Sequence, residues 1–117
     1  MTIRELADHL NARVLLGEEQ LDQIVESAFG SDLMSDVLAF VNDKAVLLTG
    51  LVNPHVIRTA EMLDLGCIVF VRGKEPAAEI IELAEELDIV VLCTDYTMYA
   101  SCGILYSKGL SASARRD

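Results

Sequence analysis

The stretch AVLLTGLVNPHVIRTAEMLDLGCIVFV, residues 45–71, decides the fold. It begins and ends with an apolar run of five residues, each of which predicts a buried β-strand, and the segment between them predicts a helix. Asn53 is a suitable N-cap for that helix, Pro54 suits its first position, and Gly66 suits its end. A strand, a helix and a strand in this order predict two parallel strands joined by a right-handed crossover.

The same alternation continues downstream. Residues 76–87 (PAAEIIELAEEL) predict a helix with one apolar and one acidic face, residues 89–93 (IVVLC) predict a third strand, and residues 94–109 (TDYTMYASCGILYSKG) contain the next helix. Strands that are apolar almost throughout are typical of a parallel sheet with helices on both faces. We therefore predict an α/β fold with a parallel core.

The first 44 residues are less regular. IRELADHLN (3–11) predicts a short helix, RVLLG (13–17) and QIVESAF (23–29) predict strands, and SDLMSDVLAFV (31–41) predicts a helix capped by Ser31 or Asp32. No linker or repeat divides the chain. We predict a single domain over residues 1–110, followed by a flexible tail over residues 111–117.

The charge of the chain limits its partners. Nineteen acidic and nine basic residues give a formal net charge of −10, which repels phosphate backbones, so we predict no binding to nucleic acid. No apolar run approaches the roughly 20 residues that span a bilayer, so we expect a soluble, cytoplasmic protein without membrane contact. The three cysteines and two histidines lack the spacing of a metal site, and we predict neither a metal nor a cofactor.

The best candidate for a binding site is the crevice beyond the carboxyl ends of the parallel strands, because open α/β sheets usually bind their ligands there. Each strand there leads into a helix N-terminus, which favours an anion, and Arg72 and Lys74 are among few cations in an acidic chain. The opposing interpretation is that the hydroxyls and glycines of these junctions serve only as helix caps and turns. The predicted ligand-binding residues are Thr49, Gly50, Asn53, Arg72, Gly73, Lys74, Thr94, Asp95 and Thr97.

Catalytic motifs are absent from the sequence. It contains no G-x-S-x-G elbow and no G-x-x-x-x-G-K-[ST] loop, so we predict no catalytic residues. The alternative is a small phosphoryl- or acyl-transfer enzyme that uses Arg72, Asp95 and Thr97 at the same edge of the sheet. A different surface is suggested by Tyr96, Tyr99 and Tyr106, because tyrosine joins apolar area to a polar tip and suits interfaces. We predict these three residues in a homodimer contact.

Two segments, VLLTGLVNPHVIRTAEMLDLGCIVFV (46–71) and VVLCTDYTMYASCGIL (90–105), resemble the DRTGG domain family, with GSDLMSDVLAFV (30–41) as the first matching segment. That family is similar in turn to the N-terminal domain of HPr kinase/phosphorylase. The resemblance implies a three-layer α/β/α sandwich with a mostly parallel, mixed sheet of about five strands, often dimeric. It also implies a regulatory or architectural role beside catalytic and CBS domains, for example in certain pyrophosphatases.

One departure from the family pattern concerns the loop after the central strand. Where the family commonly has Thr-Gly-Gly, this chain has Thr49-Gly50-Leu51, which implies a less close approach of a ligand to the backbone. With no P-loop, the chain is not an HPr kinase by itself. The predicted function is a non-catalytic, homodimeric regulatory module that binds a small anionic metabolite or nucleotide, or docks on a partner protein. Purely structural pairing with another chain is a third alternative.

Overall fold

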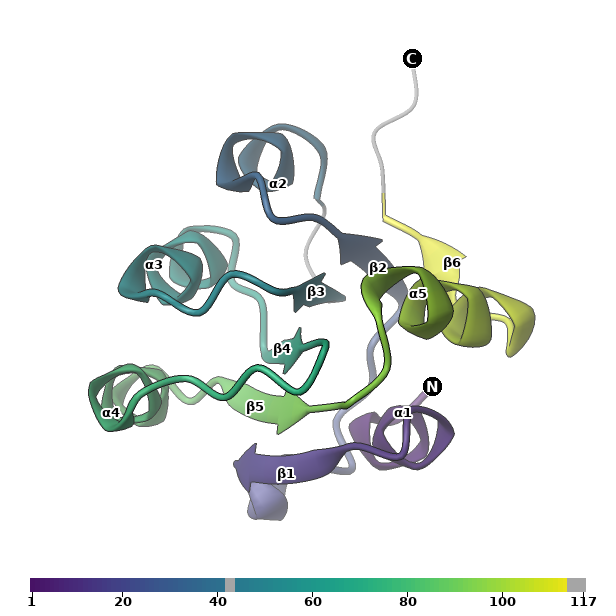
Figure 1. Ribbon diagram of the computed structural model, residues 1–117, viewed down its shortest axis with the longest axis horizontal. Helices are drawn as coiled ribbons and strands as arrows, with labels where there is room; N and C mark the ends of the chain where they lie inside the picture. The colour runs from purple at the N-terminus through teal and green to yellow at the C-terminus, as the bar shows by residue number, and fades with distance from the viewer. Residues whose placement is uncertain (42–43, 114–117) are drawn as a thin grey trace.

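A six-stranded sheet carries the fold of the computed structural model, which describes residues 1–41 and 44–113 (Figure 1). In chain order the elements are α1 (Ile3–His9), β1 (Arg13–Leu16), the 3₁₀ helix η1 (Glu18–Gln20), β2 (Ser27–Gly30), α2 (Met34–Phe40), β3 (Ala45–Thr49), α3 (Pro54–Met62), β4 (Cys67–Phe70), α4 (Ala78–Glu86), β5 (Val90–Cys93), α5 (Met98–Ser107) and β6 (Ser111–Ala112). No helix in the described ranges is long and apolar enough to cross a membrane.

The strands lie in the order β1-β5-β4-β3-β2-β6. All neighbouring pairs are parallel except β1 and β5, which are antiparallel, so the sheet is mixed and mostly parallel. Helices α2, α3 and α4 cover one face, and α1 and α5 cover the other (Figure 1). The predicted α/β/α sandwich is confirmed, with six strands in the described residues in place of about five.

The position of each helix follows from the direction of its crossover. From β2 to β5 the chain moves one strand at a time in the same direction, so right-handed connections place α2, α3 and α4 on one face. After β5 the chain returns across the sheet to β6, beyond β2, and the reversed direction places α5 on the opposite face. The loops that leave β4 and β5 therefore lead to opposite faces, which makes this pair the switch point of the sheet.

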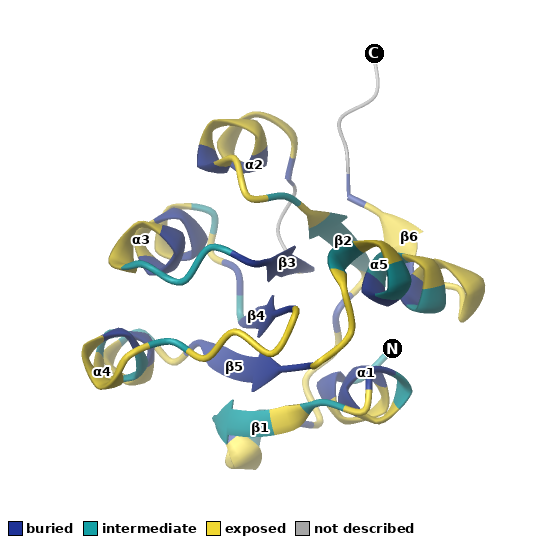
Figure 2. Ribbon diagram, viewed as in Figure 1, coloured by how far each residue is buried: buried dark blue, intermediate teal, exposed yellow. Residues whose placement is uncertain are grey.

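The core has two parts, one on each face of the sheet. Every residue of β3, β4 and β5 is buried, as Figure 2 shows, because alternate side chains enter the two layers. Val46 and Leu48 pack in the layer with α1 and α5, while Leu47 and Phe70 pack in the layer with α2, α3 and α4. These buried strands hold the loops at their ends in fixed positions.

The start of α2 and the end of α3 differ from the predictions. Neither Ser31 nor Asp32 caps α2: its N-cap residue is Leu33, without a side-chain cap bond. The Ser31 hydroxyl accepts a hydrogen bond from the Leu33 N–H at 3.0 Å, before the helix begins. Helix α3 begins at Pro54 with Asn53 as its cap, as predicted, but it ends at Met62, and the left-handed residue after it is Asp64 (φ 57°), not Gly66. A short polar residue replaces the expected glycine there.

Strands β2 and β6, which are neighbours at one side of the sheet, also differ from the sequence predictions. Only the last part of the segment 23–29 is a strand, because β2 begins at Ser27 and continues to Gly30. At the C-terminus, Ser111 and Ala112 form β6, which pairs in parallel with β2, and Ser113 is buried. The structure therefore places the first three residues of the predicted tail in the folded domain, and residues 114–117 lie outside the described residues.

Candidate functional site

Five segments that are distant in the sequence meet at one edge of the sheet. The loops after β2, β3, β4 and β5 all leave this edge because those strands are parallel, and β1, which is antiparallel, begins there. We call this region the carboxyl edge. It contains the predicted residues Thr49, Gly50, Asn53, Arg72, Gly73, Lys74, Thr94, Asp95 and Thr97, and it adds Arg13 and Asp32.

The switch point between β4 and β5 is bridged by the main chain. The Arg72 N–H donates to the Tyr96 carbonyl and the Gly73 N–H donates to the Thr94 carbonyl, each at 2.8 Å. Arg72 and Gly73 are both left-handed, with φ of 61° and 69°, which turns their N–H groups toward the neighbouring loop. The Gly73 and Arg72 N–H groups are therefore engaged within the protein, and an anion at this point has to be bound by side chains.

The threonine and asparagine side chains of the predicted site hold backbone groups. Thr94 is fully buried, and its hydroxyl donates to the Leu10 carbonyl at 2.7 Å while accepting from the Tyr96 N–H at 3.2 Å. Thr97 caps α5 by accepting from the Ala100 N–H, and Asn53 caps α3 by accepting from the His55 N–H. For these three residues the structure supports the interpretation as helix caps and turns, with Thr97 and Asn53 as caps and Thr94 in a turn.

Asp32, one of the two residues predicted to cap α2, instead organises the loop after β3. Its Oδ1 accepts a hydrogen bond from the Gly50 N–H at 2.7 Å and another from the Thr49 hydroxyl at 3.0 Å. Thr49 and Gly50 are buried, so Asp32 satisfies polar groups that water does not reach easily. No local pattern signals this contact, because it depends on β2 lying beside β3.

Replacing Asp32 by alanine is expected to lower the free energy of unfolding by about 1.5–3 kcal/mol, since two hydrogen bonds to a charged acceptor are lost and the Gly50 N–H is left buried. Urea unfolding followed by circular dichroism measures the change. Asp32→Asn is the matched control, because it keeps the acceptor oxygen and should lower the free energy of unfolding clearly less than Asp32→Ala does. An equal loss in both variants would show that the charge, and not the acceptor geometry, is what matters.

Arg72 and Lys74 are the free cations of the carboxyl edge. Both are exposed, and within residues 1–41 and 44–113 neither side chain makes a hydrogen bond or an ion pair. The Arg72 guanidinium lies directly over Gly50, where a Cβ would collide with it. The absence of a side chain at Gly50 therefore makes room for this chain's own arginine, among the residues predicted to bind a ligand.

Arg13 was not predicted as a site residue. Its guanidinium lies 3.4 Å from Asp95 Oδ1 and 3.2 Å from Glu75 Oε2, and it contacts the Cys93 sulfur at 3.2 Å. Burial raises the pKa of the Cys93 thiol, and the Arg13 charge opposes that shift only in part. A thiol with a raised pKa is protonated at neutral pH and is a weak nucleophile. A lone arginine at the start of a strand carries no sequence signal for this cluster.

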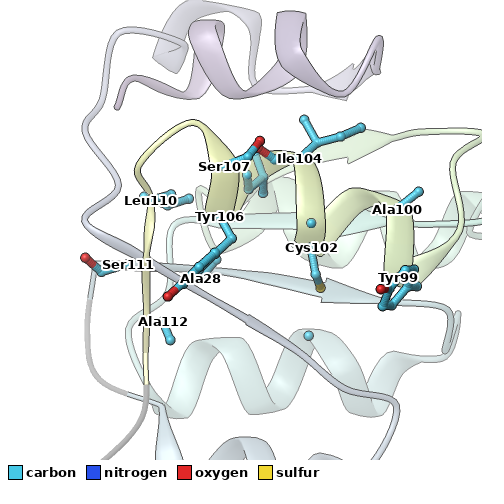
Figure 3. Close-up of a pocket in the computed structure, with 13 residues that line it drawn as sticks. Ala28, Tyr99, Ala100, Cys102, Ile104, Tyr106, Ser107, Leu110, Ser111 and Ala112 are labelled. Carbon is cyan, nitrogen blue, oxygen red and sulfur yellow. The ribbon is translucent and has the colours of Figure 1, made fainter.

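The three predicted interface tyrosines lie on or just before α5. Tyr96 is 38% exposed in the loop beside Arg72, whereas Tyr99 (90%) and Tyr106 (73%) project from α5. Tyr99 and Tyr106 line an apolar groove of about 620 Å³ between α5 and the strands β2 and β6 (Figure 3). In the part of the chain that the structure describes, no group of His, Cys, Asp and Glu side chains is arranged to hold a metal ion.

Comparisons with known proteins identify the family. Among solved structures, the chain is similar to the CBS and DRTGG domains of the regulatory region of Clostridium perfringens pyrophosphatase, complexed with the activator diadenosine tetraphosphate, with a TM-score of 0.72 and 17% sequence identity. That match covers 99% of this chain and 51% of the other, so this chain spans about half of its length. No curated protein matches the chain. The family model of the DRTGG domain matches residues 5–107, and the chain belongs to the DRTGG domain family.

Proposed function

We propose that this DRTGG domain is a regulatory module that binds a small anionic metabolite or nucleotide at the carboxyl edge, through Arg72 and Lys74. The observation that carries the proposal is the exposed Arg72 guanidinium, which has no partner among the described side chains and lies at the switch point of the sheet. The similar regulatory region from Clostridium perfringens is complexed with a nucleotide activator, which supports the same class of ligand here.

The charge distribution favours a phosphate or carboxylate at this point. An arginine fork matches either group with two parallel hydrogen bonds, and Lys74, two residues away, adds a second positive charge. Arg72 also has a left-handed backbone (φ 61°), a conformation that costs a non-glycine residue about 1–2 kcal/mol. Such strain is found most often at ligand clamps and switches, where the surrounding structure maintains it.

The alternative of a phosphoryl- or acyl-transfer enzyme is less well supported. It requires Asp95 and Thr97 to act on a substrate beside Arg72. The Asp95 carboxylate is paired with Arg13, and the Thr97 hydroxyl caps α5, so both side chains already have structural partners. Binding of an anion by Arg72 and Lys74 does not require Asp95 or Thr97 to leave these partners. The homodimer, docking on a partner protein, the cytoplasmic location and the likeness to the N-terminal domain of HPr kinase/phosphorylase stay predictions.

A thermal-shift screen against nucleotides, including diadenosine tetraphosphate, and against phosphorylated metabolites and small carboxylates tests the proposal. A ligand at 100 times its Kd adds about 2.7 kcal/mol of stability, which raises Tm by several degrees in a domain of this size. Arg72→Ala should weaken that ligand roughly 10- to 100-fold, because it removes charge-assisted hydrogen bonds.

Arg58→Ala is the matched control, since Arg58 is an exposed arginine on α3 that pairs with Glu61 at 3.1 Å. It should bind the ligand as the unmodified chain does. If no compound raises Tm, or if the rise in Tm is unchanged in Arg72→Ala, binding at the carboxyl edge is contradicted. Turnover that is lost in Asp95→Asn, in a variant that remains folded, would favour the enzyme.

A further inference from the structure

Arg13 adds a positive charge to the carboxyl edge from a distant part of the chain. It opens β1, where it lies opposite Cys93, the last residue of β5. Its guanidinium contacts the Asp95 and Glu75 carboxylates, and its side chain remains 47% exposed. Ion pairs between exposed groups contribute little to stability. The two carboxylates therefore fix where the Arg13 guanidinium lies more than they stabilise the fold.

Two short paths join the Arg13 guanidinium to the turn after β4. Asp95 Oδ1, which accepts from Arg13 Nη1 at 3.4 Å, lies 3.2 Å from the position that a Cβ of Gly73 would take. The Cys93 sulfur accepts from Arg13 Nη2 at 3.2 Å, and its thiol donates to the Lys74 carbonyl at 3.2 Å. On each path a single oxygen or sulfur atom lies between the guanidinium and the turn, so Arg13 belongs to the same site.

The contacts of Arg13 leave part of its guanidinium free to bind a ligand. A guanidinium presents several N–H donors in one plane. Nη1 donates to Asp95, and Nη2 donates to Glu75 and Cys93. The Nε–H donates to no group within residues 1–41 and 44–113. Arg13 can therefore bind an anion without leaving its carboxylate partners, which act as positioning residues.

The spacing of the cations limits the size of the anion that contacts them together. The Arg72 guanidinium lies over Gly50, after β3, and the Arg13 guanidinium contacts Cys93 at the end of β5. Strand β4 lies between these two strands (Figure 1), and its end leads to Lys74. Two strand spacings separate the two guanidinium groups by roughly 10 Å. A single phosphate is too small to make short hydrogen bonds to both, whereas a chain of phosphoryl groups is long enough.

We propose that the anion bound at the carboxyl edge carries a diphosphate or triphosphate group, and that Arg13 binds it together with Arg72 and Lys74. This inference rests on the proposed function and names the ligand chemistry of the same site. Phosphoryl groups in a chain place negative charges at short, regular intervals. Each group can therefore face a cation from a different strand end, while inorganic phosphate contacts only Arg72 and Lys74.

NMR titration of the isotope-labelled chain with inorganic triphosphate and with inorganic phosphate tests the proposal. At about 0.15 M salt the Debye length is about 8 Å, which limits effects of distant charges. Arg13→Ala should raise the Kd of triphosphate at least about 10-fold, because it removes charge-assisted hydrogen bonds, and should change the Kd of phosphate less than about twofold. The Arg13 Nε–H signal, assigned by its absence in this variant, should shift on addition of triphosphate and not of phosphate.

Arg4→Ala is the matched control, since Arg4 is also an exposed arginine that pairs with a carboxylate, Asp22, at 3.3 Å. It lies at the start of α1, whereas the opposite end of this helix reaches the carboxyl edge, where the Leu10 carbonyl accepts from Thr94. Arg4→Ala should leave both Kd values unchanged. A rise in the Kd of triphosphate equal to that in Arg13→Ala would overturn the contact with Arg13.

Removal of Arg13 also leaves the charges of Asp95 and Glu75 unpaired, and their repulsion of an anion has to be separated from a lost contact. In a chain that carries Asp95→Asn and Glu75→Gln these charges are absent, and Arg13→Ala should still raise the Kd of triphosphate at least about 10-fold. If the effect disappears in this background, Arg13 only neutralises the two carboxylates, and the proposal is wrong.

The remaining outcomes distinguish this inference from the proposed function. If Arg72→Ala weakens both anions while Arg13→Ala weakens neither, the anion site stands and the diphosphate or triphosphate group is overturned. If neither anion binds, both are overturned. Citrate is the third probe, because it carries several carboxylates on a short chain. If citrate binds as tightly as triphosphate and depends equally on Arg13, the ligand is a polycarboxylate and the phosphoryl chemistry is overturned.

Discussion

Replacing Phe70 by alanine is expected to lower the free energy of unfolding by about 3–5 kcal/mol, the usual cost of removing a buried aromatic ring. Phe70 ends β4, is fully buried, and packs between the sheet and the layer of α2, α3 and α4. A domain of this size has a stability of about 5–15 kcal/mol, so a single cavity at this position would remove a large part of it.

Urea unfolding gives the change directly, and Phe40→Ala is the control. Phe40 is 44% exposed, and its ring stacks on Phe29 with the ring centroids 6.5 Å apart, so its loss should cost only about 1 kcal/mol. Because Phe70 lies two residues before Arg72, its variant should also weaken any anion bound at the carboxyl edge. Equal losses in the two variants would contradict the central position of Phe70 in the core.

The second large effect is expected at Gly17, between β1 and η1. Gly17→Ala should lower the free energy of unfolding by about 2–5 kcal/mol, for two reasons that add. The residue has a φ of 98°, and an L side chain in the left-handed region costs about 1–2 kcal/mol. A Cβ would also lie 2.8 Å from Val90 Cγ2 and 3.1 Å from Val90 Cα, and such overpacking costs about 1–3 kcal/mol.

Gly109→Ala separates the two contributions. Gly109 has almost the same φ (99°), but a Cβ there would meet no atom within 4 Å, so this variant should show the backbone cost alone. The difference between the two variants, measured by urea unfolding, is the cost of the contact with Val90. If the two variants lower the free energy of unfolding equally, the backbone at Gly17 does not lie as close to Val90 as it does in the structure.

Local sequence signals predicted the central elements. Strand β3 has the predicted bounds, and β4 and β5 differ by one residue each, because runs of apolar and β-branched residues form buried strands almost regardless of their surroundings. The caps Asn53 and Thr97 were also predictable, since an N-cap bond joins residues two or three positions apart. The DRTGG resemblance rested on these same segments, and the family model confirms it.

The parts that failed depend on pairing between distant segments. Strand β6 has two residues and no signal of its own, and it is a strand only because β2 lies beside it. Asp32 looked like a helix cap, but its partner is the Gly50 N–H in the loop after the neighbouring strand. The homodimer contact of Tyr96, Tyr99 and Tyr106 stays a prediction, with Tyr96 in the loop before α5 and Tyr99 and Tyr106 on the helix.

The amino-acid sequence by itself determined the alternation of the central strands and helices, the N-caps of α3 and α5, the acidic charge and the family, because each is a local or additive property of the chain. Only the tertiary structure decided which side chains at the carboxyl edge are free. Arg13 meets Asp95 across 82 positions because β1 joins the sheet antiparallel to β5, and this contact leaves Arg72 and Lys74 unpaired among the described residues. Strand order is a global property, since it depends on the hand and direction of every crossover, and it is strand order that brings these charges together.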